Sequence, residues 1–117
     1  MIPIEALADP VRRRVLELLA AGEQPAGRIS ARVTQEFGIS QPAASRHLRV
    51  LRAAGLVHCR AEGARRLYAV DPTGLREIDA WLRQFRGLWS QALSALETEV
   101  ARGKHVADNP KEQHELR

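Results

Sequence analysis

The sequence predicts a mainly α-helical protein with one small β-hairpin and a long C-terminal helix. Three observations indicate this fold class. Gly22, Gly38 and Gly55 follow three segments in which apolar residues recur at helical spacing. The stretch 57–70 alternates apolar and polar residues around a glycine turn, as a hairpin does. From 71 to about 102, apolar residues recur every three or four positions without a break, which is typical of one long helix.

Length and composition limit the domain organisation. The chain has 117 residues, of which 44% are apolar, and this suffices for one domain over 1–102 followed by a polar, flexible tail at 103–117. No apolar run approaches the length of about 18 residues that a membrane span needs. A charged N-terminus without an apolar core and a single cysteine predict a cytoplasmic protein with no secretion signal and no internal disulfide.

Two helices are predicted in the first third of the chain, after a short helical turn at Ile4 and Leu7. Asp9 is a good N-cap and Pro10 suits the first helical position, so the first helix begins there and ends before Gly22. The second helix covers 25–37. The predicted apolar faces comprise Val11, Val15, Leu18 and Leu19 in the first helix and Ala26, Ile29, Val33 and Phe37 in the second.

The most informative segment is the predicted helix at 41–54. Ser40 precedes it as an N-cap, and Gly55 ends it as a left-handed residue. Ala44, Leu48 and Leu51 recur at i, i+4 and i+7, so they predict a buried stripe. The other faces of this helix are polar and basic and carry Gln41, Ser45, Arg46, Arg49 and Arg52.

A hairpin is predicted at 57–70, directly after this helix. Val57, Cys59 and Ala61 alternate with polar neighbours in its first strand, and Leu67 and Ala69 alternate with Tyr68 and Val70 in its second. The turn is the sequence Glu-Gly-Ala-Arg at 62–65. Two helices joined by a glycine turn and followed by a basic hairpin form a winged helix-turn-helix, with the hairpin as its two-stranded wing.

The last predicted helix, 71–102, carries a pattern close to a heptad repeat. A helix of ~28 residues is ~42 Å long, which exceeds the core that so small a domain can offer. Its apolar stripe therefore needs another chain, and we expect a homodimer. The expected dimer interface comprises Ile4, Leu7, Ile78, Leu82, Phe85, Trp89 and Leu96.

The positive charge of the chain is concentrated in one window. Residues 40–66 contain six arginines and one acidic residue, whereas the rest of the chain is close to neutral. An α-helix with its side chains is about 10–12 Å across and matches the ~12 Å major groove of B-DNA. We therefore expect Arg46 to bind guanine, Gln41 to read adenine, and Ser45 to contact a base or a phosphate. Further phosphate contacts are expected from Ser40, Arg49 and Arg52.

The wing is expected to add Arg60, Arg65 and Arg66 to the DNA contacts, at the flanking minor groove or backbone. The alternative interpretation is a solvated basic face that binds nothing.

Residues 38–57, GISQPAASRHLRVLRAAGLV, resemble the recognition-helix block of the ArsR/SmtB family of winged-helix repressors. ALADPVRR at 6–13 resembles the opening helix of that family, and EGAR at 62–65 resembles its wing tip. The resemblance implies a homodimeric bacterial or archaeal repressor that binds an inverted repeat in double-stranded DNA and blocks RNA polymerase.

The metal sites of the family are not expected here, nor is a cofactor. The family's Cys-x-Cys pair falls on Pro25 and Gly27, neither of which can ligate a metal, and Asp79 has no histidine or acidic partner of the family's kind on the last helix. No catalytic constellation is present either, because His58 and Cys59 point to opposite faces of a strand. A weaker metal hypothesis involves the irregularly spaced tail residues His105, Asp108, His114 and Glu115.

Several alternatives stay open at this point. Cys59 is either a small buried residue or a redox-sensitive thiol, and His47 is either a packing or phosphate-contacting residue or a switch. Trp81, Phe85 and Trp89 are either dimer core or part of a pocket for an apolar effector. At the level of the whole protein, the alternatives are a repressor that responds to a metal, an oxidant or an apolar ligand, and a winged-helix module that binds proteins instead of DNA.

Overall fold

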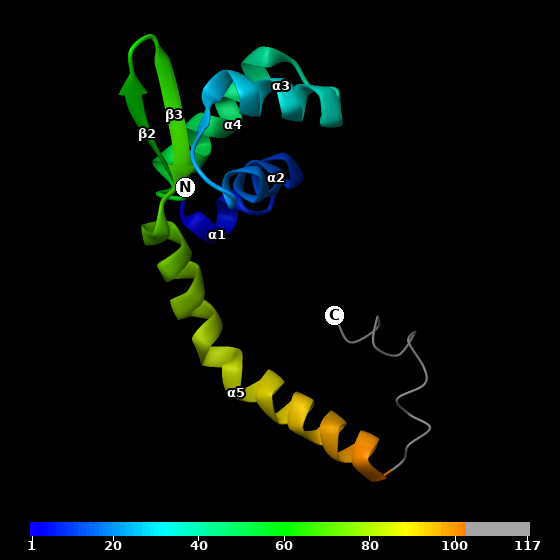
Figure 1. The fold of residues 1–117 in the computed structure, drawn as a ribbon. Helices are drawn as coiled ribbons and strands as arrows, with labels where there is room; N and C mark the ends of the chain where they lie inside the picture. Colours follow the sequence, from blue (N-terminus) through cyan, green and yellow to red (C-terminus); the bar gives the residue numbers. More distant parts are fainter. Residues whose placement is uncertain (103–117) are drawn as a thin grey trace. The chain divides into compact units, whose positions relative to one another are not determined.

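The structure, a computed structural model, describes residues 1–102 (Figure 1). It confirms the predicted fold class, and the C-terminal helix is continuous. The tail at 103–117, with the four residues of the weaker metal hypothesis, lies outside the described residues. The elements are α1 (Pro3–Ala6), α2 (Pro10–Leu19), β1 (Gln24–Pro25), α3 (Ala26–Phe37), α4 (Gln41–Ala53), β2 (Val57–Glu62), β3 (Arg65–Val70) and α5 (Pro72–Arg102).

The predicted caps define where the helices begin and end. The Asp9 carboxylate accepts hydrogen bonds from the backbone N–H groups of Val11, at 2.7 Å, and Arg12, at 3.3 Å, and so begins α2. The Ser40 hydroxyl accepts one from the N–H of Ala43 at 3.2 Å and begins α4 in the same way. Gly38 ends α3 with φ of 66°, a conformation that glycine adopts without strain.

The sheet has three strands, one more than the sequence predicts. Its order is β1-β3-β2, all antiparallel, with Gln24 opposite Tyr68 and Pro25 opposite Leu67. β1 is only two residues long, too short to show alternation, and its proline resembles a helix start. Pro25 consequently caps α3 from outside instead of opening it. The Gln24 side-chain amide donates to the carbonyl of Leu18 at 2.6 Å and holds this segment against α2.

The core lies where α2, α3 and α4 pack together, and the β2–β3 hairpin flanks α3 and α4 (Figure 1). The predicted stripe of Ala44, Leu48 and Leu51 is buried, as expected. The prediction for Phe37 is wrong: its side chain is 39% exposed, because α3 ends there and no further turn covers it. The strict alternation predicted for β3 is also wrong. Leu67 and Tyr68 are both buried, since β3 is the central strand of the sheet.

The described chain divides into two compact units, the first ending at Ala80 and the second beginning at Trp81. The first turns of α5 belong to the first unit. There the N–H of Gly74 donates to the carbonyl oxygen of Gly55 at 2.8 Å, and a Cβ atom at Gly74 would lie 2.6 Å from that oxygen. Only glycine permits this close approach. Ile78, one turn further along, packs against the core of the same unit.

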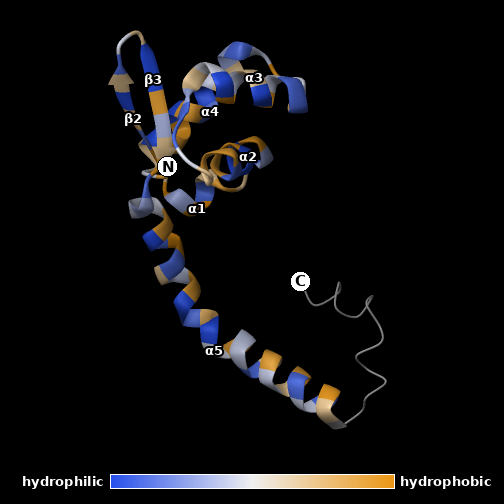
Figure 2. Cartoon of the chain, in the orientation of Figure 1, coloured by the Kyte–Doolittle hydropathy of each residue, from blue (hydrophilic) through white to orange (hydrophobic). Residues whose placement is uncertain are grey.

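Within the second unit, α5 carries apolar side chains that the described chain leaves exposed. Trp81 is 49% exposed and Leu88 is 67% exposed, and Figure 2 shows hydrophobic and hydrophilic residues alternating along this helix. Among the described helices, none combines the length and the apolar character that crossing a membrane requires.

Candidate nucleic-acid interface

The buried stripe of α4 fixes which of its side chains face outward. Leu48 and Leu51 anchor the helix in the core, so Gln41, Arg46 and Arg49 project from its other faces and are exposed. Ser45 is half-buried beside them. Arg52 is exposed near the C-terminal end, one turn after Leu48, and Ser40 is exposed at the other end, where it caps the helix.

The arginines of α4 keep their charges uncompensated. Within residues 1–102, Arg46, Arg49 and Arg52 form no ion pair, and the same holds for Arg66 on β3. Two arginines of α2 and α3 behave differently. Arg14 and Arg32 both bind the carboxylate of Glu36, at 2.8 Å and 2.6 Å. The unpaired arginines of α4 and Arg66 give this region free positive charge, as a polyanion-binding surface requires.

The wing arginines are not equivalent, which the sequence does not reveal. The Arg60 guanidinium makes two hydrogen bonds to the Glu23 carboxylate, at 2.8 Å and 2.7 Å, and a third to Glu62 at 3.1 Å. These bonds raise the pKa of Arg60, and the bond from Arg60 lowers the pKa of Glu23. Arg65 binds Glu62 at 3.2 Å. Of the three wing arginines, Arg66 alone has no acidic partner among the described residues.

His47 faces α2 rather than the outside of α4. Its Nδ1 lies 3.2 Å from a guanidinium nitrogen of Arg12, whose Nε in turn donates to the carbonyl of Ala6 at 2.6 Å. Burial lowers the pKa of His47, and the charges of Arg12 and Arg46 lower it further, while Asp9 opposes them. A neutral imidazole accepts the hydrogen bond from Arg12, so His47 joins α1, α2 and α4 in a packing role.

Cys59 is half-buried and lies opposite Tyr68 across the hairpin, while His58 on the other face is exposed. Burial raises the pKa of the Tyr68 hydroxyl, and its interaction with the Cys59 thiol raises it further. Residues 1–102 hold no group of three or more His, Cys, Asp or Glu side chains arranged to bind a metal ion.

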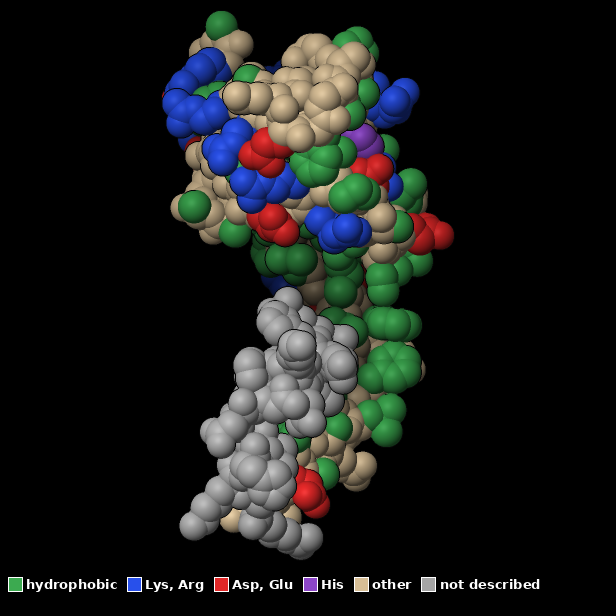
Figure 3. Space-filling view, turned by 90° about the vertical axis from the view of Figure 1, so that its right-hand side faces the viewer, with side chains coloured by type: hydrophobic (Ala, Val, Ile, Leu, Met, Phe, Trp, Pro, Cys, Tyr) green, Lys and Arg blue, Asp and Glu red, His purple; other side chains and the backbone are tan. Residues whose placement is uncertain are grey.

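The residues expected at a dimer interface fall into two sets. Leu7 and Ile78 are half-buried and pack against the core of their own chain. Ile4 and the α5 residues Leu82, Phe85 and Trp89 are exposed, and Leu96 is half-buried. The rings of Trp81 and Phe85 are in contact, with centroids 4.9 Å apart and planes tilted by 59°. Figure 3 shows hydrophobic side chains along the visible face of α5.

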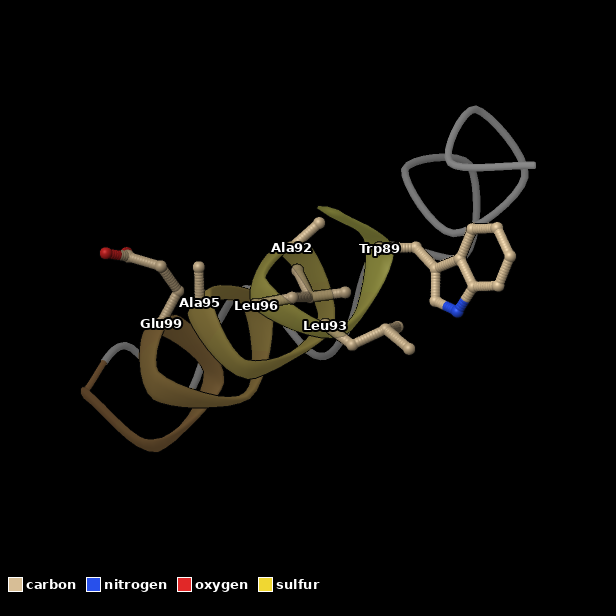
Figure 4. A pocket seen from close by; sticks show the side chains of 6 residues that line it. All are labelled: Trp89, Ala92, Leu93, Ala95, Leu96 and Glu99. Carbon is tan, nitrogen blue, oxygen red and sulfur yellow. The ribbon is translucent and has the colours of Figure 1, made fainter. Parts of the chain in front are cut away.

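A shallow groove of about 300 Å³ lies on α5 within this apolar stretch (Figure 4). Among residues 1–102 its lining comes from α5, and five of the six described side chains are apolar: Trp89, Ala92, Leu93, Ala95 and Leu96, with Glu99 at one end. A groove of this kind can take the side chains of a second helix. The sequence marks these positions through their heptad-like spacing.

Comparisons with known proteins agree with this geometry. A family model described as a helix-turn-helix domain matches residues 7–60. The chain is 41% identical over 90 residues to the HTH-type transcriptional regulator Rv2034 of Mycobacterium tuberculosis, covering 77% of this chain and 78% of that one. It is 33% identical over 81 residues to the transcriptional repressor SdpR of Bacillus subtilis, covering 69% and 86%.

Two solved structures share the fold. A crystal structure named Possible transcriptional regulator for arsenical resistance superposes with a TM-score of 0.62 at 38% identity, covering 85% of this chain and 96% of that one. The solution structure of the homodimeric winged helix-turn-helix DNA-binding domain of Mb0332 from Mycobacterium bovis, described as a possible ArsR-family transcriptional regulator, superposes with a TM-score of 0.55 at 29% identity. The match covers 73% of this chain and 75% of that one.

Proposed function

This chain belongs to the ArsR/SmtB family of winged helix-turn-helix transcriptional regulators, and we propose that it is a homodimeric repressor that binds a pseudo-palindromic operator in double-stranded DNA. The proposal assigns it a binding function in the cytoplasm and no catalysis.

The observation that carries the proposal is the set of unpaired arginines on the outward faces of α4. A helix anchored by one apolar stripe and carrying free guanidinium groups elsewhere is suited to the major groove. Arg46 is the residue proposed to bind guanine through O6 and N7, with Gln41 reading adenine. Ser45 contacts a base or a phosphate, and the phosphate contacts of α4 come from Ser40, Arg49 and Arg52.

The wing contributes unequally in this proposal. Arg66 is free to contact the DNA backbone beside the major groove. Arg60 and Arg65 are proposed as secondary contacts, because Glu23 and Glu62 already neutralise much of their charge. Each must exchange a carboxylate for a phosphate when the complex forms.

The exposed apolar stretch of α5 is proposed to pair with its counterpart in a second copy, with Leu82, Phe85, Trp89 and Leu96 as its centre. Burying such aromatic and aliphatic side chains against a partner is favourable at roughly 25 cal/mol per Å² of apolar surface. A two-fold dimer presents two α4 helices to successive major grooves, about 34 Å apart. The operator should therefore contain two inverted half-sites separated by about one turn of DNA.

Salt-dependent DNA binding tests the proposal. The operator is first selected from random duplexes with the wild-type protein, and binding is then measured by fluorescence anisotropy between 50 and about 300 mM salt. If Arg49, Arg52 and Arg66 of each protomer neutralise phosphates, the slope of log K against log salt should be about −5. The absence of salt-sensitive binding to any duplex would overturn the proposal and favour a protein-binding module.

A further inference from the structure

A cleft of about 280 Å³ opens between the N-terminus of α3, the polar side of α4 and strand β3. We propose that this cleft is a phosphate pocket that holds one backbone phosphate of the DNA, with the Ser30 hydroxyl as a direct donor. The inference rests on the proposed function and adds a contact from α3, an element that neither the predicted recognition helix nor the wing includes. The residues of the cleft that matter are Gly27, Ser30, Gln41, Ser45, Arg49 and Arg66.

Ser30 is the observation that singles out this cleft. The residue is 3% exposed, and its hydroxyl makes no hydrogen bond to any residue in 1–102. The hydroxyl is not sealed inside the protein, because among the described residues no fully enclosed side-chain oxygen or nitrogen lacks a partner. It therefore reaches the cleft that the residue lines. A hydroxyl that opens only into such a cleft and bonds no other group of the protein can donate to a ligand bound there.

Ser30 does not use the backbone carbonyl partner that a hydroxyl inside a helix usually finds. A serine or threonine inside a helix commonly donates to a backbone carbonyl three or four residues earlier. Thr34 does so, donating to the carbonyl of Ala31 at 3.0 Å. Ser30 makes no such bond, and its donor remains available toward the cleft.

Positive charge converges on the same cleft from three elements. Arg49 from α4 and Arg66 from β3 both line it, and neither forms an ion pair with a described residue. The N-terminus of α3 adds a third contribution. Pro25, its N-cap, has no side chain that can accept from the first N–H groups, and its first turn contains no acidic residue. Those N–H groups are left without a side-chain cap and are available to an anion.

The chemistry of the cleft selects an oxyanion that only accepts hydrogen bonds. Its polar groups are the hydroxyls of Ser30, Ser45 and Tyr68, the Gln41 amide, two guanidinium groups and helix N-terminal amides, and none of the described residues that line it is acidic. A phosphodiester presents two such oxygens and one negative charge, and guanidinium groups match it well. Free phosphate shares this chemistry. We assign the cleft to DNA because Gln41 and Ser45, which line it, belong to the first half of α4 that the proposed function places against the groove.

Ser30→Ala is the variant that tests the pocket. Removing a hydroxyl that bonds no other group of the protein should leave the thermal midpoint unchanged or raise it. Losing one hydrogen bond to a charged phosphate should weaken binding to the selected operator about tenfold, because such bonds are worth more than neutral ones. The matched control is Ser90→Ala, an exposed serine on α5 that is not part of the cleft lining, which should bind DNA like wild type.

A methylphosphonate scan of the operator identifies the phosphate concerned. Each substitution removes the charge of one backbone phosphate. In each half-site one position should weaken wild-type binding strongly and weaken Ser30→Ala less, because the share of that contact made by the serine is already lost while Arg49 and Arg66 remain. Arg66→Gln, at an exposed position, should show reduced sensitivity at the same position and a salt slope smaller in magnitude by about 1 per protomer.

The outcomes separate the pocket from the proposed function. If wild type binds no duplex, both fail. If wild type binds and Ser30→Ala binds equally, with the same methylphosphonate pattern, the pocket fails and the proposed function stands. The other possible ligand of the cleft is free phosphate. A titration of the free protein with inorganic phosphate, monitored by amide NMR, tests for it. Millimolar phosphate that shifts the Ser30 amide, with no effect of Ser30→Ala on DNA binding, would overturn the assignment to DNA.

Discussion

Glu23→Gln should increase the affinity of this protein for DNA, although Glu23 precedes the sheet and lies outside the basic window of the sequence. In the structure its carboxylate binds the Arg60 guanidinium through two hydrogen bonds, at 2.8 Å and 2.7 Å. Glutamine keeps the size of the side chain and removes the charge. Arg60 then retains only its 3.1 Å contact with Glu62 and becomes free to move toward a phosphate.

The magnitude follows from counterion release. Each additional phosphate contact changes the slope of log K against log salt by about −0.9, so one per protomer changes the slope of the dimer by about −1.8. Over a fourfold rise in salt, the affinity of the variant should therefore fall about 3.5-fold more per added contact than that of wild type. The advantage of the variant should be greatest at low salt and should shrink as salt is added. Fluorescence anisotropy with one duplex at four or more salt concentrations measures both the affinity and the slope.

Glu17→Gln is the matched control, because it changes the net charge by the same amount. Glu17 binds Arg14 at 3.3 Å on the exposed side of α2, away from the wing. If Glu17→Gln steepens the slope as much as Glu23→Gln does, the effect comes from net charge and the reasoning about Arg60 is refuted. An unchanged slope in Glu23→Gln would show that Arg60 contacts no phosphate even when it is free.

Four further variants test other parts of the structure. Arg46→Ala should relax the base preference and weaken operator binding by about 1–3 kcal/mol; an unchanged preference in a competition assay would exclude base contact. Trp89→Ala should shift the dimer toward monomer in sedimentation velocity, because it removes a large apolar side chain from the exposed stripe of α5, and a variant as dimeric as wild type would contradict that interface. Gly74→Ala should destabilise the fold by about 1–3 kcal/mol in urea unfolding, because the new methyl group meets a backbone carbonyl oxygen at 2.6 Å. Gly87→Ala, where nothing lies within 4 Å of the new methyl group, should stabilise the fold because alanine favours the helix. Because the pKa of His47 is lower in the folded state than in the unfolded one, protons bind preferentially to the unfolded state, so stability should fall as the pH drops below about 6.5. His47→Gln should flatten that dependence, and an unchanged pH profile would exclude His47 as its source.

The elements and the main polar face could be predicted from the sequence, because they depend on interactions between residues close together in the chain. Helical spacing of Ala44, Leu48 and Leu51 indicated which side of α4 is buried, and that assignment left its arginines facing outward. Side-chain caps such as Asp9 act within three residues of the helix they begin, so they can be recognised locally. The spacing along α5 likewise predicted a continuous helix with an apolar stripe.

Only the tertiary structure decided which of the charged and polar side chains are free. Arg60 and Glu23 are 37 residues apart. They meet because β1, formed by Gln24 and Pro25, pairs with β3. With only two residues, β1 has no periodic signal in the sequence. The Ser30 hydroxyl is notable only because the neighbouring elements enclose it on one side and leave it open to a cleft on the other. Periodicity and capping act between neighbours in the chain, whereas the charge that a guanidinium presents depends on which carboxylates the fold brings within hydrogen-bond distance.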